Sequence, residues 1–240
     1  MGDRKILVSL TTLAAMSQVD LPGWETKLEE IEYFNLNEIA LFLTGLSKEK
    51  RNELYQAIEK TSVKSIPHIH IRTDMDRTEL DYLYRKYSVK AFNLHALEEF
   101  PLQHDYGKEL NSILYLENSR VVPDEKDLEE YGGLCVDFAH WEGEKLKGNT
   151  EYVQKMDHLV KKIKIGCAHI SAIKNEPTPI VIDATKREYD SHVLGNLSEL
   201  NYLKKYKAYF PEIMSIELEN PIAEQLEAKK YTEKIISDKK

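Results

Sequence analysis

The chain has 240 residues, of which 42% are hydrophobic, and its formal net charge is −8. This length and composition allow a sizeable buried core and argue against a disordered chain. The net negative charge provides no general attraction to nucleic acid or to anionic membranes, although it does not rule out a local basic patch.

The N-terminal segment MGDRKILVSL has too short an apolar run for a signal peptide and lacks the Ser or Thr of a myristoylation motif. No apolar stretch approaches the ~20 residues that a membrane span needs. The two cysteines, Cys135 and Cys167, each lie within an apolar run, which suits reduced core thiols better than a disulfide. We therefore expect a cytoplasmic protein without a membrane-spanning segment.

Short runs rich in Ile, Val and Leu alternate with amphipathic segments along the whole chain, and no Gly/Ser-rich or Pro-rich linker interrupts them. The runs predict eight strands, at 5–10, 38–44, 65–72, 90–96, 113–118, 134–139, 165–171 and 213–219. Helices are expected at 24–34, 48–60, 77–87, within 98–112, and at 125–131, 150–163, 197–210 and 223–237. Eight alternations predict an α/β protein with a single (β/α)8 barrel domain over residues 1–240.

In such a barrel, one face of each strand packs against the outer helices and the other points into the barrel, with functional groups at the carboxyl ends. The apolar alternation therefore identifies the residues that point inward. The polar ones on that face are His68, His70, Arg72, Asn93, His95, Tyr115, Glu117, Asp137, His169, Ser171, Ser215, Glu217 and Glu219.

Several carboxylates on one axis require a counter-charge, because like charges and desolvation both oppose their ionisation. A divalent cation supplies that charge. Mixed carboxylate and imidazole ligands suit zinc, manganese, cobalt or iron better than calcium. No Gly-rich phosphate loop or nucleotide fingerprint occurs, so we expect a divalent metal (zinc, manganese, cobalt or magnesium) and no nucleotide cofactor.

Five motifs carry a family resemblance: YLENS (115–119), CVDFAH (135–140), AHIS (168–171), DSHVLG (190–195) and ELENP (217–221). Together they resemble the xylose isomerase-like barrels, a superfamily of sugar isomerases, epimerases and endonuclease IV-type nucleases (AP endonuclease family 2). The resemblance implies a metal site of Glu117, Asp137, His169 and Glu219. Glu219 is preferred over Glu217 because the family glutamate commonly sits close before a proline.

The endonuclease branch of that superfamily builds a trinuclear zinc cluster with further histidines and an Asp-x-His pair. In sugar isomerase relatives, equivalents of His140 and of the Asp-x-His pair bind or position the substrate, so the extra residues fit both branches. The resemblance offers His68 or His70, His95, His140, Asp190 and His192 for these positions.

From the sequence, we favour a metal-dependent sugar or sugar phosphate isomerase or epimerase. Glu117 and Glu219 would be the paired acid and base beside the carbonyl carbon. Arg72, Arg120 and Lys174 are candidates for holding an anionic group of the substrate.

Two other functions stay open. The first is an endonuclease IV-like zinc phosphodiesterase acting on abasic DNA, which the short loops disfavour because they offer little to grip a duplex. The second is a non-catalytic barrel that binds a metal or a sugar. The expected partner is a small sugar, with nucleic acid not favoured, and the segment 223–240 offers a packing face for a homo-oligomer.

Overall fold

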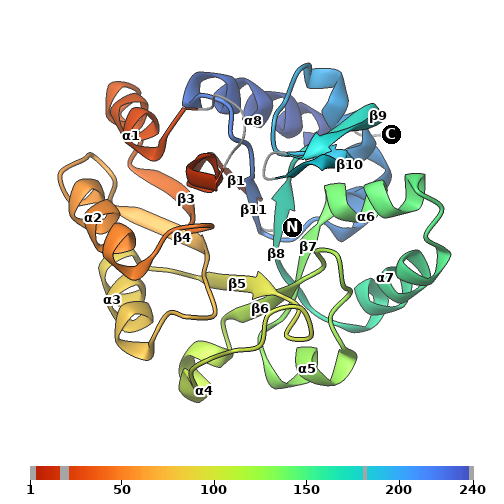
Figure 1. Ribbon diagram of the computed structural model, residues 1–240, viewed down its shortest axis with the longest axis horizontal. Coiled ribbons are helices and arrows are strands. Elements are labelled where there is room, and N and C mark those ends of the chain that lie inside the picture. Colours follow the sequence, from red (N-terminus) through yellow and green to blue (C-terminus); the bar gives the residue numbers. More distant parts are fainter. Residues whose placement is uncertain (1–3, 17–21, 181–182, 238–240) are drawn as a thin grey trace.

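The computed structural model describes residues 4–16, 22–180 and 183–237. Eight parallel strands close into a barrel with helices around it (Figure 1). The first strand has two parts, and their pairing closes the barrel: β1 (Lys5–Leu7) pairs with β11 (Ile213–Ile216), and β2 (Ser9–Thr11) pairs with β3 (Glu38–Phe42). The predicted (β/α)8 barrel is confirmed.

The remaining barrel strands are β4 (Ser65–His70), β5 (Ala91–His95), β6 (Leu114–Glu117), β7 (Gly133–Asp137) and β8 (Ile165–Ile170). The helices are α1 (Trp24–Tyr33), α2 (Lys48–Ile58), α3 (Arg77–Tyr87), α4 (Gly107–Asn111), α5 (Glu125–Glu130), α6 (Phe138–Leu146), α7 (Thr150–Lys162) and α8 (Ile222–Ser237). Two 3₁₀ segments are η1 (Leu13–Met16) and η2 (Leu197–Tyr209). None of the described helices is long and apolar enough to cross a membrane.

The core forms between the outward faces of the strands and the apolar faces of the helices. Ile69, Phe92, Leu116 and Val136, from four adjacent strands, are fully buried in it. The alternate positions of the same strands point into the barrel, as the period-two pattern predicted. The inward positions near the strand ends carry polar residues such as His70 and Glu117, whereas others carry apolar ones such as Ala40 and Phe42.

The strand expected over 134–139 ends earlier than predicted. β7 ends at Asp137, whose Oδ1 accepts the N–H groups of Ala139 (2.7 Å) and His140 (2.8 Å) and so caps α6. Phe138 and Ala139 are therefore helical, and the helix α6 was missed. The apolar run continued past Asp137, so the sequence did not show the change from strand spacing to helical spacing.

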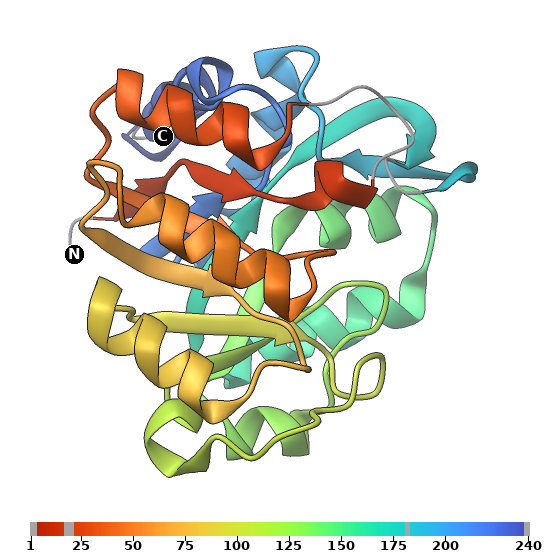
Figure 2. The ribbon, with the colours of Figure 1, turned by 60° about the vertical axis from the view of Figure 1, so that its left-hand side comes forward.

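A β-hairpin lies in the connection after β8, where no element was predicted. β9 (Ala172–Ile180) and β10 (Asp183–Ser191) pair antiparallel outside the barrel sheet. Figure 2 shows the hairpin projecting beyond the ends of the barrel strands. This connection is longer than the short loops expected after most strands, because the described hairpin residues 172–180 and 183–191 lie over one end of the barrel.

Candidate metal centre

Three predicted ligands meet the glutamate that was the second choice at the carboxyl ends of neighbouring strands. The four residues are Glu117 on β6, Asp137 on β7, His169 on β8 and Glu217 just after β11, with one ligand atom of each lying within 4.8 Å of the others. His169 Nδ1 lies 3.3 Å from Glu117 Oε1, 3.1 Å from Glu217 Oε2 and 3.9 Å from Asp137 Oδ2. We call these four residues the central group.

The central group holds buried polar atoms that have no hydrogen-bond partner. Within the described part of the chain, Asp137 Oδ2, Glu217 Oε2 and both ring nitrogens of His169 are buried without a hydrogen bond. Such atoms are costly in a folded protein unless another group satisfies them. Because carboxylate oxygen and imidazole nitrogen are ordinary zinc or manganese ligands, the residues fit a divalent cation.

A second set of donors adjoins the first through Glu117. His70, His95 and Glu117 also bring one ligand atom each within 4.8 Å of the others, and His70 Nε2 lies 3.2 Å from Glu117 Oε2. We call these three residues the flanking group. Asn93 donates a 2.7 Å hydrogen bond to Glu117 Oε2. The two carboxylate oxygens of Glu117 therefore face different groups, as a bridging ligand requires.

A third set lies at the mouth of the barrel. His140 Nδ1 is 3.1 Å from Asp190 Oδ2, and the rings of His140 and His192 are 6.3 Å apart. We call His140, Asp190 and His192 the rim group. Gly143 permits this approach, because a Cβ atom there would lie 2.8 Å from Asp190 Oδ1. The hairpin thus supplies Asp190, and His192 follows directly after it, for a group that begins on α6.

Electrostatics of the central group favour positive charge at its centre. Burial opposes the protonated form of His169, but Glu117 and Glu217 hold its pKa well above the ordinary value. Burial also opposes ionisation of Glu217, yet His192 and His169 lower its pKa to about 2. Burial raises the pKa of Asp137. A divalent cation supplies this positive charge more strongly than a proton does.

The other two groups differ in their protonation. Burial lowers the pKa of His95 to about 4, against the attraction of Glu117, which leaves a neutral imidazole suited to ligation. Burial opposes charge on His140, but Asp137 and Asp190 raise its pKa well above the ordinary value. Partial burial likewise opposes ionisation of Asp190, and His140 nevertheless lowers its pKa to about 2.

The preference for Glu219 over Glu217 requires correction. Glu219 is buried apart from the central group, where its Oε2 accepts a 2.6 Å hydrogen bond from Lys27 Nζ. Lys27 also donates to Thr11 Oγ1 at 2.5 Å. Strand β11 ends at Ile216, so the alternation that gave both glutamates one parity does not extend to Glu219. The nearby proline was therefore a poor guide.

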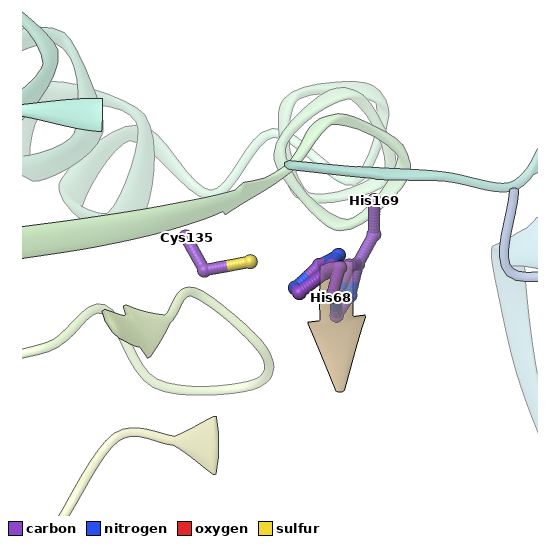
Figure 3. Close-up of side chains that lie close together, drawn as sticks. All are labelled: His68, Cys135 and His169. Atoms are coloured by element: carbon purple, nitrogen blue, oxygen red, sulfur yellow. The ribbon is translucent and has the colours of Figure 1, made fainter. Parts of the chain in front are cut away.

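His70, and not His68, joins the flanking group. His68 is fully buried deeper in the barrel, and its Nδ1 lies 2.7 Å from Ser215 Oγ. Figure 3 shows His68 beside Cys135 and His169, which come from other strands. Their ligand atoms form a further set within 4.8 Å of one another.

A cavity of about 370 Å³ opens onto these groups. Its walls include apolar residues such as Leu94, Phe100 and Ile180, the last from the hairpin. Of the anion-binding candidates, Arg72 and Arg120 line the cavity, whereas Lys174 is not among the lining residues and forms a 2.7 Å ion pair with Glu199. Members of all three groups line the same cavity: His70, His95, Glu117, His140, Asp190, His192 and Glu217.

Two asparagines were given no role from the sequence. Asn93 orients Glu117, and the amide of Asn118 bonds both backbone groups of Asp137, accepting from N at 2.9 Å and donating to O at 2.9 Å. Such partners fix the direction of a ligand. The inward parity of Asn93 was a usable signal, whereas nothing in the sequence linked Asn118 to Asp137.

No family model and no curated protein matches the sequence. Two solved structures match almost all of it. The probable 3-DHS dehydratase AsbF from Bacillus anthracis, described as involved in petrobactin synthesis, is 15% identical, with a TM-score of 0.46 and coverage of 98% of this chain and 100% of that one. A xylose isomerase domain-containing protein from Salmonella typhimurium is 13% identical, with a TM-score of 0.44 and coverage of 99% and 98%.

Proposed function

We propose that the chain is a metal-dependent enzyme that hydrolyses phosphate esters of small molecules. The observation that carries this proposal is the position of Glu117, which belongs to two adjacent donor groups and faces each with a different oxygen. A shared carboxylate between two such groups is the arrangement of a two-metal site, and two-metal sites are typical of phosphatases and nucleases. This reverses the preference drawn from the sequence.

His70, His95 and Glu117 would hold one ion, and Glu117, Asp137, His169 and Glu217 a second. The rim group would hold a third ion in the manner of the endonuclease branch that the motifs resemble. Divalent ions at these positions would polarise a phosphoryl oxygen and acidify water. In this reaction water adds to phosphorus, the ester P–O bond breaks, and the alcohol leaves with one proton.

The chain's own residues contribute binding and proton transfer. Arg72 and Arg120 line the cavity, and Arg120 forms no ion pair or hydrogen bond with any described residue, so its guanidinium is available to an anionic substrate. When no third ion is held there, His140, protonated beside Asp190, would donate the proton to the leaving oxygen. Asn93 and Asn118 would hold Glu117 and Asp137 in place.

The size of the cavity favours a small substrate. About 370 Å³ lies at the lower end of the range for small-molecule sites, and residues of the hairpin form part of the wall. A nucleotide flipped out of a duplex would require the duplex itself to reach the same opening. We therefore expect abasic DNA to be a poor substrate.

The isomerase or epimerase remains the second candidate, because Glu117 and Glu217 both line the cavity and both face His169. This pair replaces Glu117 and Glu219, since Glu219 is held by Lys27. The two carboxylates would exchange a proton with the carbon next to a sugar carbonyl.

One set of assays separates the candidates. Protein freed of metal with a chelator and reloaded with zinc or manganese is tested on a chromogenic phosphodiester, a sugar phosphate panel and an abasic duplex. The same protein is incubated with ketoses in deuterated water. We expect hydrolysis of small esters that falls at least about a hundredfold in Glu117→Gln.

Glu219→Gln is the matched control, because it alters a buried glutamate outside the donor groups and should retain hydrolysis in its folded fraction. Deuterium exchange without hydrolysis would replace the proposal by the isomerase. Hydrolysis that persists in Glu117→Gln would contradict the proposed hydrolase. Inactivity in every assay would favour a non-catalytic binding barrel.

A further inference from the structure

A further ligand set, made of His68, Cys135 and His169, lies inside the barrel on the inward faces of β4, β7 and β8 (Figure 3). All three side chains are fully buried. One ligand atom of each lies within 4.8 Å of the other two. We call this set the interior group, and it shares only His169 with the central group.

The free nitrogens of the two histidines carry the argument. His68 Nδ1 is engaged with Ser215 Oγ at 2.7 Å, which leaves Nε2 as the nitrogen available to a ligand. That Nε2 has no hydrogen-bond partner among residues 4–16, 22–180 and 183–237, and neither has His169 Nε2. Because His169 Nδ1 faces the carboxylates of the central group, Nε2 is its nitrogen for the interior group.

Two imidazole nitrogens and one thiol form a recognised set of metal ligands. A His2Cys set in trigonal arrangement binds late first-row cations, and a thiolate selects zinc or cuprous ion over magnesium or calcium. All three side chains are fully buried, and the ring of Phe42 lies 6.2 Å from that of His68 and 4.9 Å from that of His169. Water therefore offers little competition for the position.

We propose that His68, Cys135 and His169 form a second kind of metal site, for a cation of the zinc or cuprous class, beneath the central group. Cys167 is the register partner of Cys135 on β8 but lies outside the set of three. With both sites occupied, His169 would ligate through both nitrogens as an imidazolate, its ring proton having passed to solvent. An ion in the interior group would therefore fix the ring that the central group also uses.

Cobalt tests this site separately, because sulfur occurs in the interior group alone of the ligand sets described. A cobalt–thiolate bond gives a charge-transfer absorption that carboxylate and imidazole ligands do not give. Metal-free protein receives cobalt both in the folded state and during refolding, since the ligands are fully buried. We expect the thiolate band in the wild type and its loss in Cys135→Ser, with one bound cobalt fewer per chain.

Three further variants complete the experiment. Cys167→Ser removes a buried thiol of the neighbouring strand and should keep the band. Asp137→Asn damages the central group and should keep the band too. If Cys135→Ser does not fold, His68→Gln replaces it, and the concentration of cobalt needed for the band should rise at least about tenfold.

Absence of the band from the folded, cobalt-loaded wild type under both loading conditions would overturn the proposal. Persistence of the band in Cys135→Ser, or its loss in Cys167→Ser alone, would overturn the assignment of the ligands. These outcomes do not depend on enzymatic activity, so they stand apart from the test of the proposed function.

Discussion

Buried charge in this barrel is arranged in two ways. Some carboxylates form ion pairs with Arg or Lys, and others gather in the central group. Beside the barrel, Arg51 binds Glu79 with two hydrogen bonds, at 2.7 and 3.0 Å, and also reaches Asp74 at 3.2 Å. Likewise Lys27 pairs with Glu219 at 2.6 Å. In the central group, by contrast, Glu117, Asp137 and Glu217 have histidine neighbours and no Lys or Arg within ion-pair distance among the described residues.

This difference separates structural from functional charge. A buried carboxylate with its own guanidinium or ammonium is already compensated and has little to offer a ligand. Carboxylates that have only imidazole neighbours, and some of whose oxygens lack a hydrogen bond, retain the capacity to bind a cation. The comparison therefore predicts that substitutions in the compensated pairs lower stability, whereas substitutions in the central group lower metal affinity.

The largest effect is expected from breaking a compensated pair. Lys27→Met leaves Glu219 buried and uncompensated, which should lower the free energy of unfolding by about 3–5 kcal/mol. Denaturant unfolding of the metal-free protein measures this loss. The double variant Lys27→Met/Glu219→Gln should regain about half of it, because no charge is then left unpaired. A double variant as unstable as the single one would contradict the interpretation.

The two glutamates after β11 provide the sharpest comparison of the regions. Glu217→Gln should weaken zinc binding by about a hundredfold, about 2.7 kcal/mol, because it removes a charged ligand from the central group. The same substitution at Glu219, two residues further on, should lower stability and leave the zinc affinity of the folded protein unchanged. Competition titration against a chelator measures both affinities. Equal losses of zinc affinity in the two variants would refute the distinction between the structural ion pair and the central group.

A smaller effect is expected within the rim group. In metal-free protein, Asp190→Asn removes a carboxylate 3.1 Å from His140 and should lower the pKa of His140 by about one unit, about 1.4 kcal/mol. Proton NMR titration of the His140 imidazole in both proteins measures the shift. An unchanged His140 titration would show that Asp190 does not act on it.

The pH dependence of stability follows from the same pair. A raised histidine pKa contributes stability below about pH 6.5 that is lost as the pH rises through the folded value. The lowered pKa of Asp190, about 2, contributes stability above about pH 4 that is lost as the pH falls toward that value. The difference between wild type and Asp190→Asn should therefore be greatest between about pH 4 and pH 6.5.

The repeating architecture could be predicted from the sequence because it depends on local patterns. Period-two runs such as 65–72 and 113–118 predicted the strands β4 and β6, and their inward parity placed His70 and Glu117 inside the barrel. The period-two pattern gave a wrong strand end where a single residue stopped the strand. Asp137 stops β7 by capping α6, and the polar sequence of 172–191 gave no sign of a hairpin stabilised by antiparallel pairing.

By itself, the sequence determined the (β/α)8 barrel and the residue types available at the carboxyl ends of its strands, since both follow from alternation along the chain. Only the tertiary structure decided which donors meet. Glu217 and Glu219 are alike in the sequence, and Lys27, 192 positions before Glu219, settles that the second glutamate forms a structural pair. His68 and His70 likewise share one parity, and their depth along β4 assigns the first to the interior group and the second to the flanking group. Distances between strands far apart in the chain fix such choices, and local sequence does not encode those distances.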